Sequence, residues 1–140
     1  EIDGVDVGKL ILSPTRTYLP MMVPILHEFR KQINGIIHCS GGAQTKVLHF
    51  TNKLHIVKDN MFALPPLFRM IQESSGTDWK EMYKVFNMGH RLEIYTNEKA
   101  AEEMINIAKG FDIEAQIVGH VEASDKKQLT INSKFGTFKY

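Results

Sequence analysis

Several features that assign proteins to common functional classes are absent from these 140 residues. Cys39 is the single cysteine, so no disulfide can form within the chain, and a reducing cytoplasm is the expected location. No apolar run reaches transmembrane length, and the start at Glu1 does not resemble a signal peptide, so we expect no membrane association. Because Glu1 is not a methionine, we also expect the sequence to be a fragment of a longer gene product.

An excess of charge of one sign is also absent. The 17 lysines and arginines nearly balance the 16 acidic residues, for a formal net charge of +1, and the two signs are interspersed along the chain. Proteins that bind nucleic acid or a membrane surface normally carry a basic patch. The charge pattern therefore argues against a nucleic-acid partner.

Sequence motifs for nucleotides and metals are missing too. There is no Gly-x-x-x-x-Gly-Lys loop, no Gly-x-Gly-x-x-Gly after a strand, and no His-Glu-x-x-His spacing among the six histidines. A structural zinc site is improbable with one cysteine. We therefore assign no metal-binding residues.

What is present is the composition and pattern of one globular domain covering residues 1–140, with 43% hydrophobic and 24% charged residues. Strand patterns alternate with helix patterns and end in a hairpin, which predicts an α/β (α+β) domain with a mixed β-sheet flanked by helices. The predicted helices are 20–31, 66–75, 79–85 and 98–109. The first predicted strand starts at 36–37 and is broken by Ser40. The other predicted strands are 54–58, 90–95, 113–121, 129–131 and 137–140.

The first predicted helix has apolar residues at helical spacing, namely Met22, Ile25, Leu26 and Phe29. Capping residues mark two other helices, Asp78 before the third and Asn97 before the fourth. These local signals fix where the predicted helices begin.

Three loops combine a backbone breaker with polar side chains at the end of an element: residues 13–18, 38–46 and 86–91. In the second loop, Gly41 and Gly42 allow positive φ and a close approach of a ligand to the main chain. His38 and Ser40 fall at the carboxyl end of the preceding strand, where open α/β sheets bind ligands. The alternative interpretation is a plain strand-to-helix turn with a polar lining.

The same loops offer other candidates with ordinary explanations. Arg16 and Arg91 are suited to phosphate or carboxylate, although Arg16 also fits a turn-stabilising pair with a surface carboxylate. Asn87 is a candidate binding residue, but it fits equally well as a residue that only ends a helix. Cys39 next to His38 suggests a thiol nucleophile, but adjacent strand residues point to opposite faces, so we interpret Cys39 as a small buried residue.

Together, the stretches LSPTRTY (12–18), HCSGG (38–42), EMYKVFNMG (81–89) and QIVGHV (116–121) resemble the carboxyl-terminal domain of the aminoimidazole ribonucleotide synthetase family, also called phosphoribosylformylglycinamidine cyclo-ligase. The similarity runs in order over nearly the whole chain, and the Asn-Met-Gly stretch with its preceding Glu-Met-Tyr is its most specific part. It implies a mixed sheet covered by helices, partly like a ferredoxin fold.

The resemblance further implies an ATP-dependent ligase that closes formylglycinamidine ribonucleotide to aminoimidazole ribonucleotide in purine biosynthesis. A preceding domain, absent from this sequence, would hold most contacts to ATP and Mg and the interface of a homodimer. The active site would lie in the cleft between the two domains, so the fragment by itself is expected to be inactive.

Residue by residue, the resemblance assigns substrate binding to eight positions: Thr15, Arg16, His38, Ser40, Gly41, Gly42, Asn87 and Gly89. This sequence departs from the family pattern at Ala43, where a third glycine is usual, at residues 44–47, which commonly hold Glu-Asn, and at residues 90–92. No residue is assigned as the catalytic acid or base.

Two alternatives remain at this stage. One is another ATP-dependent enzyme of the same architecture: selenophosphate synthetase, thiamine-phosphate kinase or a hydrogenase-maturation protein. The other is a standalone domain that binds a ligand without catalysis. An upstream ATP-binding half in the same reading frame would exclude the standalone domain.

Overall fold

The computed structural model describes residues 4, 6–14 and 17–140. They fall into two compact units. Unit 1 comprises Glu1–Ser13, Ile37–Leu92 and Val118–Tyr140, and unit 2 comprises Pro14–Ile36 and Glu93–Ile117. Two predicted site residues, Thr15 and Arg16, lie outside the described residues.

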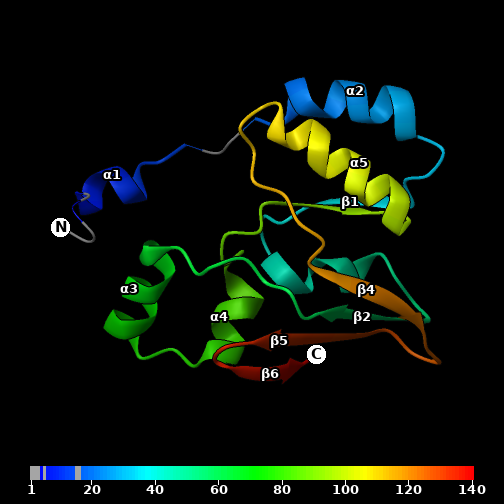
Figure 1. The fold of residues 1–140 in the computed structure, drawn as a ribbon. Coiled ribbons are helices and arrows are strands. Elements are labelled where there is room, and N and C mark those ends of the chain that lie inside the picture. Colours follow the sequence, from blue (N-terminus) through cyan, green and yellow to red (C-terminus); the bar gives the residue numbers. More distant parts are fainter. Residues whose placement is uncertain (1–3, 5, 15–16) are drawn as a thin grey trace. The chain divides into compact units, whose positions relative to one another are not determined.

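Unit 1 contains a four-stranded sheet (Figure 1) with the strand order β4-β2-β5-β6. Its strands are β2 (Leu54–Lys58), β4 (Gly119–Ala123), β5 (Gln128–Ser133) and β6 (Gly136–Lys139). β2 runs antiparallel to β4 and parallel to β5, while β5 and β6 form an antiparallel hairpin. The mixed sheet and the terminal hairpin predicted from the sequence are therefore confirmed.

The strand predicted over 113–121 is wrong for its first six residues, because β4 begins only at Gly119. The ladder between β2 and β4 starts where Lys58 pairs with Gly119, and β2 ends at Lys58. Residues 113–118 therefore lie beyond the end of their neighbour strand. In this segment the Val118 carbonyl instead accepts hydrogen bonds from the Asp59 and Asn60 amides, both at 3.1 Å.

One face of this sheet forms the core of unit 1. Ile56, Leu129 and Ile131 are 3%, 0% and 0% exposed, and strand alternation places them on the same face. Lys58 follows Ile56 by two positions, so this lysine lies on the buried face as well. It is 1% exposed.

Four helical segments accompany the sheet in unit 1: α1 (Val7–Ile11), the 3₁₀ helix η1 (Ala43–His49), α3 (Pro66–Ser75) and α4 (Trp79–Val85). α3 ends at Gly76, which has φ of 65°, and α4 begins after Asp78, whose side chain accepts the Glu81 amide at 3.1 Å. α4 buries Met82 and Tyr83 and packs against η1. α3 and α4 match their predictions, whereas the sequence did not predict the short helix α1.

Unit 2 is built on two helices that lie side by side (Figure 1), α2 (Leu19–Phe29) and α5 (Glu98–Lys109). Each buries residues at a spacing of four, which places them on one helix face; they are Met21, Ile25 and Phe29 on α2, and Ala100, Met104 and Ala108 on α5. The predicted stripe on α2 was partly wrong. It included Leu26, which is 38% exposed, and it omitted the buried Met21.

β1 (Gly35–His38) and β3 (Leu92–Tyr95) form a two-stranded sheet. β3 starts two residues later than predicted, because the His90 amide donates to the Asn87 carbonyl at 2.9 Å and keeps His90 in a turn. None of the described helices combines the length and the apolar character that crossing a bilayer requires.

Candidate functional site: two loops of unit 1

The glycine loop, residues 39–42, follows directly from strand β1. Strand alternation leaves His38 exposed and turns Cys39 inward, where it is 2% exposed, so the interpretation of Cys39 as a small buried residue is confirmed. Gly42 has φ of 79° and Ala43 has φ of 39°. Two consecutive residues with positive φ reverse the chain and begin η1.

The backbone of this loop is closed by short-range hydrogen bonds. The Ala43 amide donates to the Ser40 carbonyl at 2.8 Å, and the Thr45 amide donates to the Gly42 carbonyl at 2.9 Å. Within residues 4, 6–14 and 17–140, no backbone acceptor is recorded for the Gly41 and Gly42 amides. Both glycines are exposed, so these two N–H groups are available to a ligand.

A cation lies against the same loop. The Nζ atom of Lys46 donates to the His38 carbonyl at 3.1 Å and to the Ser40 hydroxyl at 2.6 Å. An ammonium group has three N–H donors, so these two bonds leave one donor for a ligand or for water. Free amides and a lysine ammonium at one loop are chemistry suited to an anionic group.

The second loop is the turn at Asn87, Met88 and Gly89, in which Met88 has φ of 53° and Gly89 has φ of 97°. The Asn87 side-chain oxygen accepts the Gly89 amide at 2.9 Å, which holds the turn closed. A Cβ atom at Gly89 would also lie 3.1 Å from Cγ of Pro65. Position 89 therefore favours glycine for both its backbone conformation and its tight packing.

The two loops meet through a buried glutamine. Gln44, at the start of η1, is 0% exposed, and its Nε2 donates to the Asn87 carbonyl at 2.6 Å. The Cys39 amide also donates to the Arg91 carbonyl at 2.9 Å. The structure thus joins the second and third loops, and Asn87 is the predicted site residue that takes part in these bonds. Thr15 and Arg16 of the first loop lie outside the described residues.

Sequence reasoning did not single out two residues of this junction, Gln44 and Lys58. The Nζ atom of Lys58 donates to the side-chain oxygen of Gln44 at 2.8 Å and to its backbone carbonyl at 3.1 Å. The signal that could have found Lys58 is its phase in strand 54–58, two positions after the apolar Ile56. A lysine in phase with buried residues indicates an internal polar partner.

His90, at one of the departures from the family pattern, is 3% exposed. Its Nε2 accepts the Phe62 amide at 3.1 Å, so this nitrogen carries no proton and the neutral ring is protonated on Nδ1. The ring of Phe62 packs edge-on against the imidazole, with 4.8 Å between centroids. These two contacts with Phe62 hold the turn that contains His90 against the loop before α3.

The described part of the chain contains no group of three or more His, Cys, Asp or Glu side chains placed to hold a metal ion. A phosphate would fit the Gly41 and Gly42 amides and the ammonium of Lys46, whereas Mg²⁺ prefers carboxylate oxygens that this loop does not offer.

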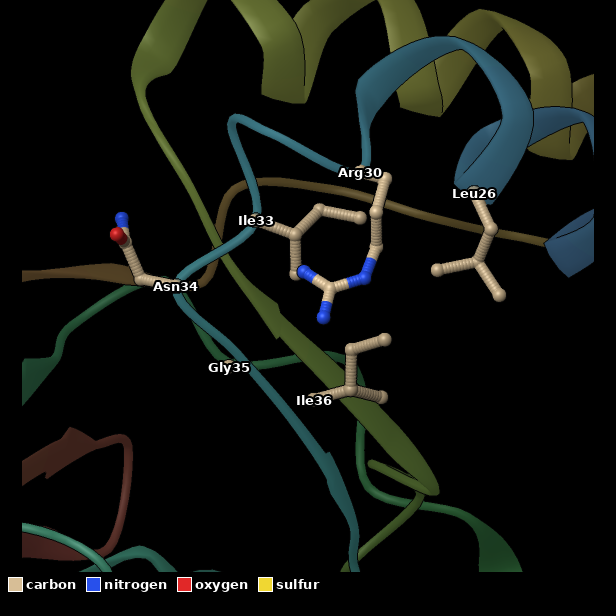
Figure 2. Close-up of a pocket in the computed structure, with 6 residues that line it drawn as sticks. All are labelled: Leu26, Arg30, Ile33, Asn34, Gly35 and Ile36. Atoms are coloured by element: carbon tan, nitrogen blue, oxygen red, sulfur yellow. The ribbon is translucent and has the colours of Figure 1, made fainter.

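A shallow pocket of about 220 Å³ lies elsewhere, in unit 2, at the end of α2. Figure 2 shows the guanidinium of Arg30 beside the side chains of Ile33 and Ile36, while the Asn34 side chain points away from them. The lining residues are Leu26, Arg30, Ile33, Asn34, Gly35 and Ile36. The six predicted site residues that the structure describes are not among them.

Comparison with known families agrees with this arrangement. Residues 1–132 match the family described as "AIR synthase related protein, C-terminal domain". The chain belongs to this family. The match covers both loops of unit 1, so the resemblance inferred from the sequence is confirmed.

Curated relatives of this AIR synthase related chain include two phosphoribosylformylglycinamidine cyclo-ligases. The protein from Methanopyrus kandleri is 32% identical over 119 residues, covering 85% of the chain and 34% of the relative. The protein from Syntrophus aciditrophicus is 27% identical over 142 residues, covering 94% of the chain and 39% of the relative. The chain therefore spans only about a third of the length of these relatives.

Among solved structures, the fold is similar to that of HypE from E. coli, described as a hydrogenase maturation protein. The TM-score is 0.59 at 17% identity, and the match covers 89% of the chain and 39% of HypE. This likeness supports the mixed α/β fold alone.

Proposed function

We propose that this chain is the carboxyl-terminal part of a phosphoribosylformylglycinamidine cyclo-ligase. Such an enzyme uses ATP to close formylglycinamidine ribonucleotide to aminoimidazole ribonucleotide in purine biosynthesis. The observation that carries the proposal is the junction of the glycine loop with the Asn87 turn through Gln44, in a chain whose curated relatives bear this name. Two of the four stretches that carry the sequence resemblance, 38–42 and 81–89, are thereby adjacent.

In this proposal the glycine loop binds an anionic group of the substrate. The amides of Gly41 and Gly42 donate to its oxygens, and His38 and Ser40 border the same position. Lys46 adds a positive charge, since its ammonium already contacts the Ser40 hydroxyl. A charge-assisted hydrogen bond of this kind contributes roughly 1.5–3 kcal/mol.

The remaining predicted residues complete the substrate site. Asn87 and Gly89 form the turn, which the hydrogen bond from Gln44 joins to the glycine loop. Thr15 and Arg16 are proposed to approach the anionic group in the complete enzyme, with the Arg16 guanidinium as a charge partner. Their role rests on the sequence resemblance.

ATP and Mg are proposed to bind mainly to a preceding domain, which would also form the interface of a homodimer in the cytoplasm. ATP would supply a phosphoryl group to the formyl oxygen of the substrate with release of ADP, and ring closure would then expel phosphate. This chain would orient the substrate and bind its anionic group, since the glycine loop suits an anion. The loop offers no carboxylates for Mg²⁺.

The test is an activity assay of the purified full-length gene product. ADP release that depends on formylglycinamidine ribonucleotide, with formation of the imidazole product, is the expected result. Parallel assays with selenide and with thiamine phosphate test the related enzymes of the same architecture. A folded full-length protein that consumes ATP only with one of those substrates, to AMP with selenide or to ADP with thiamine phosphate, would disprove the cyclo-ligase assignment.

A further inference from the structure

We propose that Gln44 is a positioning residue that sets the glycine loop against the Asn87 turn, and that Lys58 fixes the orientation of the Gln44 amide. The proposal rests on the proposed function, because it assumes that both loops contact the same substrate. It assigns a role to two buried polar residues that the substrate site itself does not use.

The first step is the orientation of the Gln44 side chain. A glutamine amide has one accepting end and one donating end, whereas a lysine ammonium can only donate. The 2.8 Å contact between Nζ of Lys58 and Oε1 of Gln44 therefore requires the oxygen to face Lys58. The NH₂ group must then face the Asn87 carbonyl, to which it donates at 2.6 Å.

The second step is the strength with which Lys58 holds this residue. The same Nζ atom also donates to the backbone carbonyl of Gln44 at 3.1 Å, so the lysine binds both the main chain and the side chain of one residue. Lys58 is 1% exposed and Gln44 is 0% exposed. Burying an ammonium is unfavourable unless it is well hydrogen-bonded, so displacement of Gln44 would leave these groups poorly satisfied.

The third step concerns the two segments that Gln44 joins, the glycine loop and the Asn87 turn. Gln44 follows Gly42 and Ala43, the two residues with positive φ that end the glycine loop. On the other side, the Asn87 carbonyl that accepts from Gln44 also accepts the His90 amide at 2.9 Å. A movement of Gln44 would therefore shift the turn relative to the loop, and displacements of about 1 Å in groups that hold a substrate strongly reduce turnover.

Substitutions at Gln44 separate positioning from simple stability. Gln44→Glu keeps an oxygen for Lys58 but places a second carboxylate oxygen against the Asn87 carbonyl, while Gln44→Leu removes both bonds. We expect both variants of the full-length enzyme to lose about tenfold or more in kcat/KM for formylglycinamidine ribonucleotide. Lys58→Met should change kcat/KM in the same direction, because it frees the Gln44 amide to turn.

The matched control is Thr130→Val, which removes the 2.8 Å bond between Thr130 and His55 in the same sheet. Strand alternation places both side chains on the face of the sheet opposite to Lys58. We expect the control to lower the unfolding temperature while kcat/KM stays within about twofold of the wild type.

A second readout is independent of catalysis. In amide NMR spectra, Gln44→Glu should shift the resonances of both Gly42 and Gly89, and Thr130→Val should leave both unchanged. If the wild-type enzyme fails to turn over formylglycinamidine ribonucleotide, the proposed function is wrong, and these spectra still test the positioning role. A folded Gln44→Glu variant with wild-type kcat/KM or unshifted Gly89 would overturn the inference, as would failure of both Gln44 variants to fold.

Discussion

Replacing Gly119 by alanine tests the close approach of β4 to the backbone of β2. A Cβ atom at this position would lie 1.8 Å from the Val57 carbonyl oxygen and 2.9 Å from Cα of Lys58. Both are backbone atoms of β2, so no side-chain rotation can relieve the overlap. β4 must therefore move away from β2 by more than 1 Å.

The expected loss of stability follows from the hydrogen bonds that this movement breaks. The movement separates the Gly119–Lys58 end of the ladder and the two 3.1 Å bonds to the Val118 carbonyl. Two hydrogen bonds contribute about 1–3 kcal/mol, and forced overpacking typically adds about 1–3 kcal/mol. We expect Gly119→Ala to lower the free energy of unfolding by about 3 kcal/mol, which corresponds to roughly 10 °C in the unfolding temperature.

Two other glycines provide graded controls. A Cβ atom at Gly41 would have nothing within 4 Å, and Gly41 has no positive φ, so Gly41→Ala should change stability by less than about 0.5 kcal/mol. Gly76 also has open space but has φ of 65°, so Gly76→Ala should cost about 1 kcal/mol through backbone strain alone.

Urea unfolding of the three purified variants, followed by circular dichroism, gives the free energies directly. The expected order of destabilisation is Gly119→Ala, then Gly76→Ala, then Gly41→Ala. A Gly119→Ala protein as stable as the Gly41→Ala protein would contradict the close approach of β4 to β2.

Three further predictions concern charge and ligands. Arg16→Ala in the full-length enzyme should raise KM or lower kcat by about tenfold, on the scale of a charged hydrogen bond, and unchanged kinetics would show that Arg16 only holds its turn. The pKa of Tyr140 is raised above 10.0, first by burial and then by Glu81 and Asp78, so the folded state favours the neutral phenol and stability should fall as the pH rises above about 10. Tyr140→Phe should flatten this decline in urea unfolding from pH 8 to 11, and equal slopes would contradict it. Calorimetric titration of the 140-residue chain with Mg-ATP should show no micromolar binding, and such binding or ADP release by the chain alone would refute the proposed division between domains.

Elements bounded by local signals were predictable from the sequence. β2 and α5 have the predicted bounds, 54–58 and 98–109. At the start of α5, the side chain of Asn97 accepts the Ala100 amide at 3.0 Å, which is the capping bond that the sequence pattern indicates. Caps and glycine stops act within a few residues, so they need no tertiary information.

Elements that depend on a distant partner were not predictable in the same way. Residues 113–118 have strand-like composition, but β2 ends at Lys58 and leaves them without a ladder. On α2, both faces carry apolar residues, and packing against α5 decided that Met21 is buried and Leu26 is 38% exposed. Periodicity alone does not choose between two apolar faces.

For the candidate site, the sequence by itself determined the two loops of unit 1. Of the glycines in these loops, Gly42 and Gly89 have positive φ, whereas Gly41 does not. Only the tertiary structure decided how the loops are joined. Gln44 and Asn87 are 43 positions apart, and the direction of the Gln44 amide depends on a lysine from a third segment. A hydrogen bond between distant residues requires both backbones to be in place, which no local pattern of residues encodes.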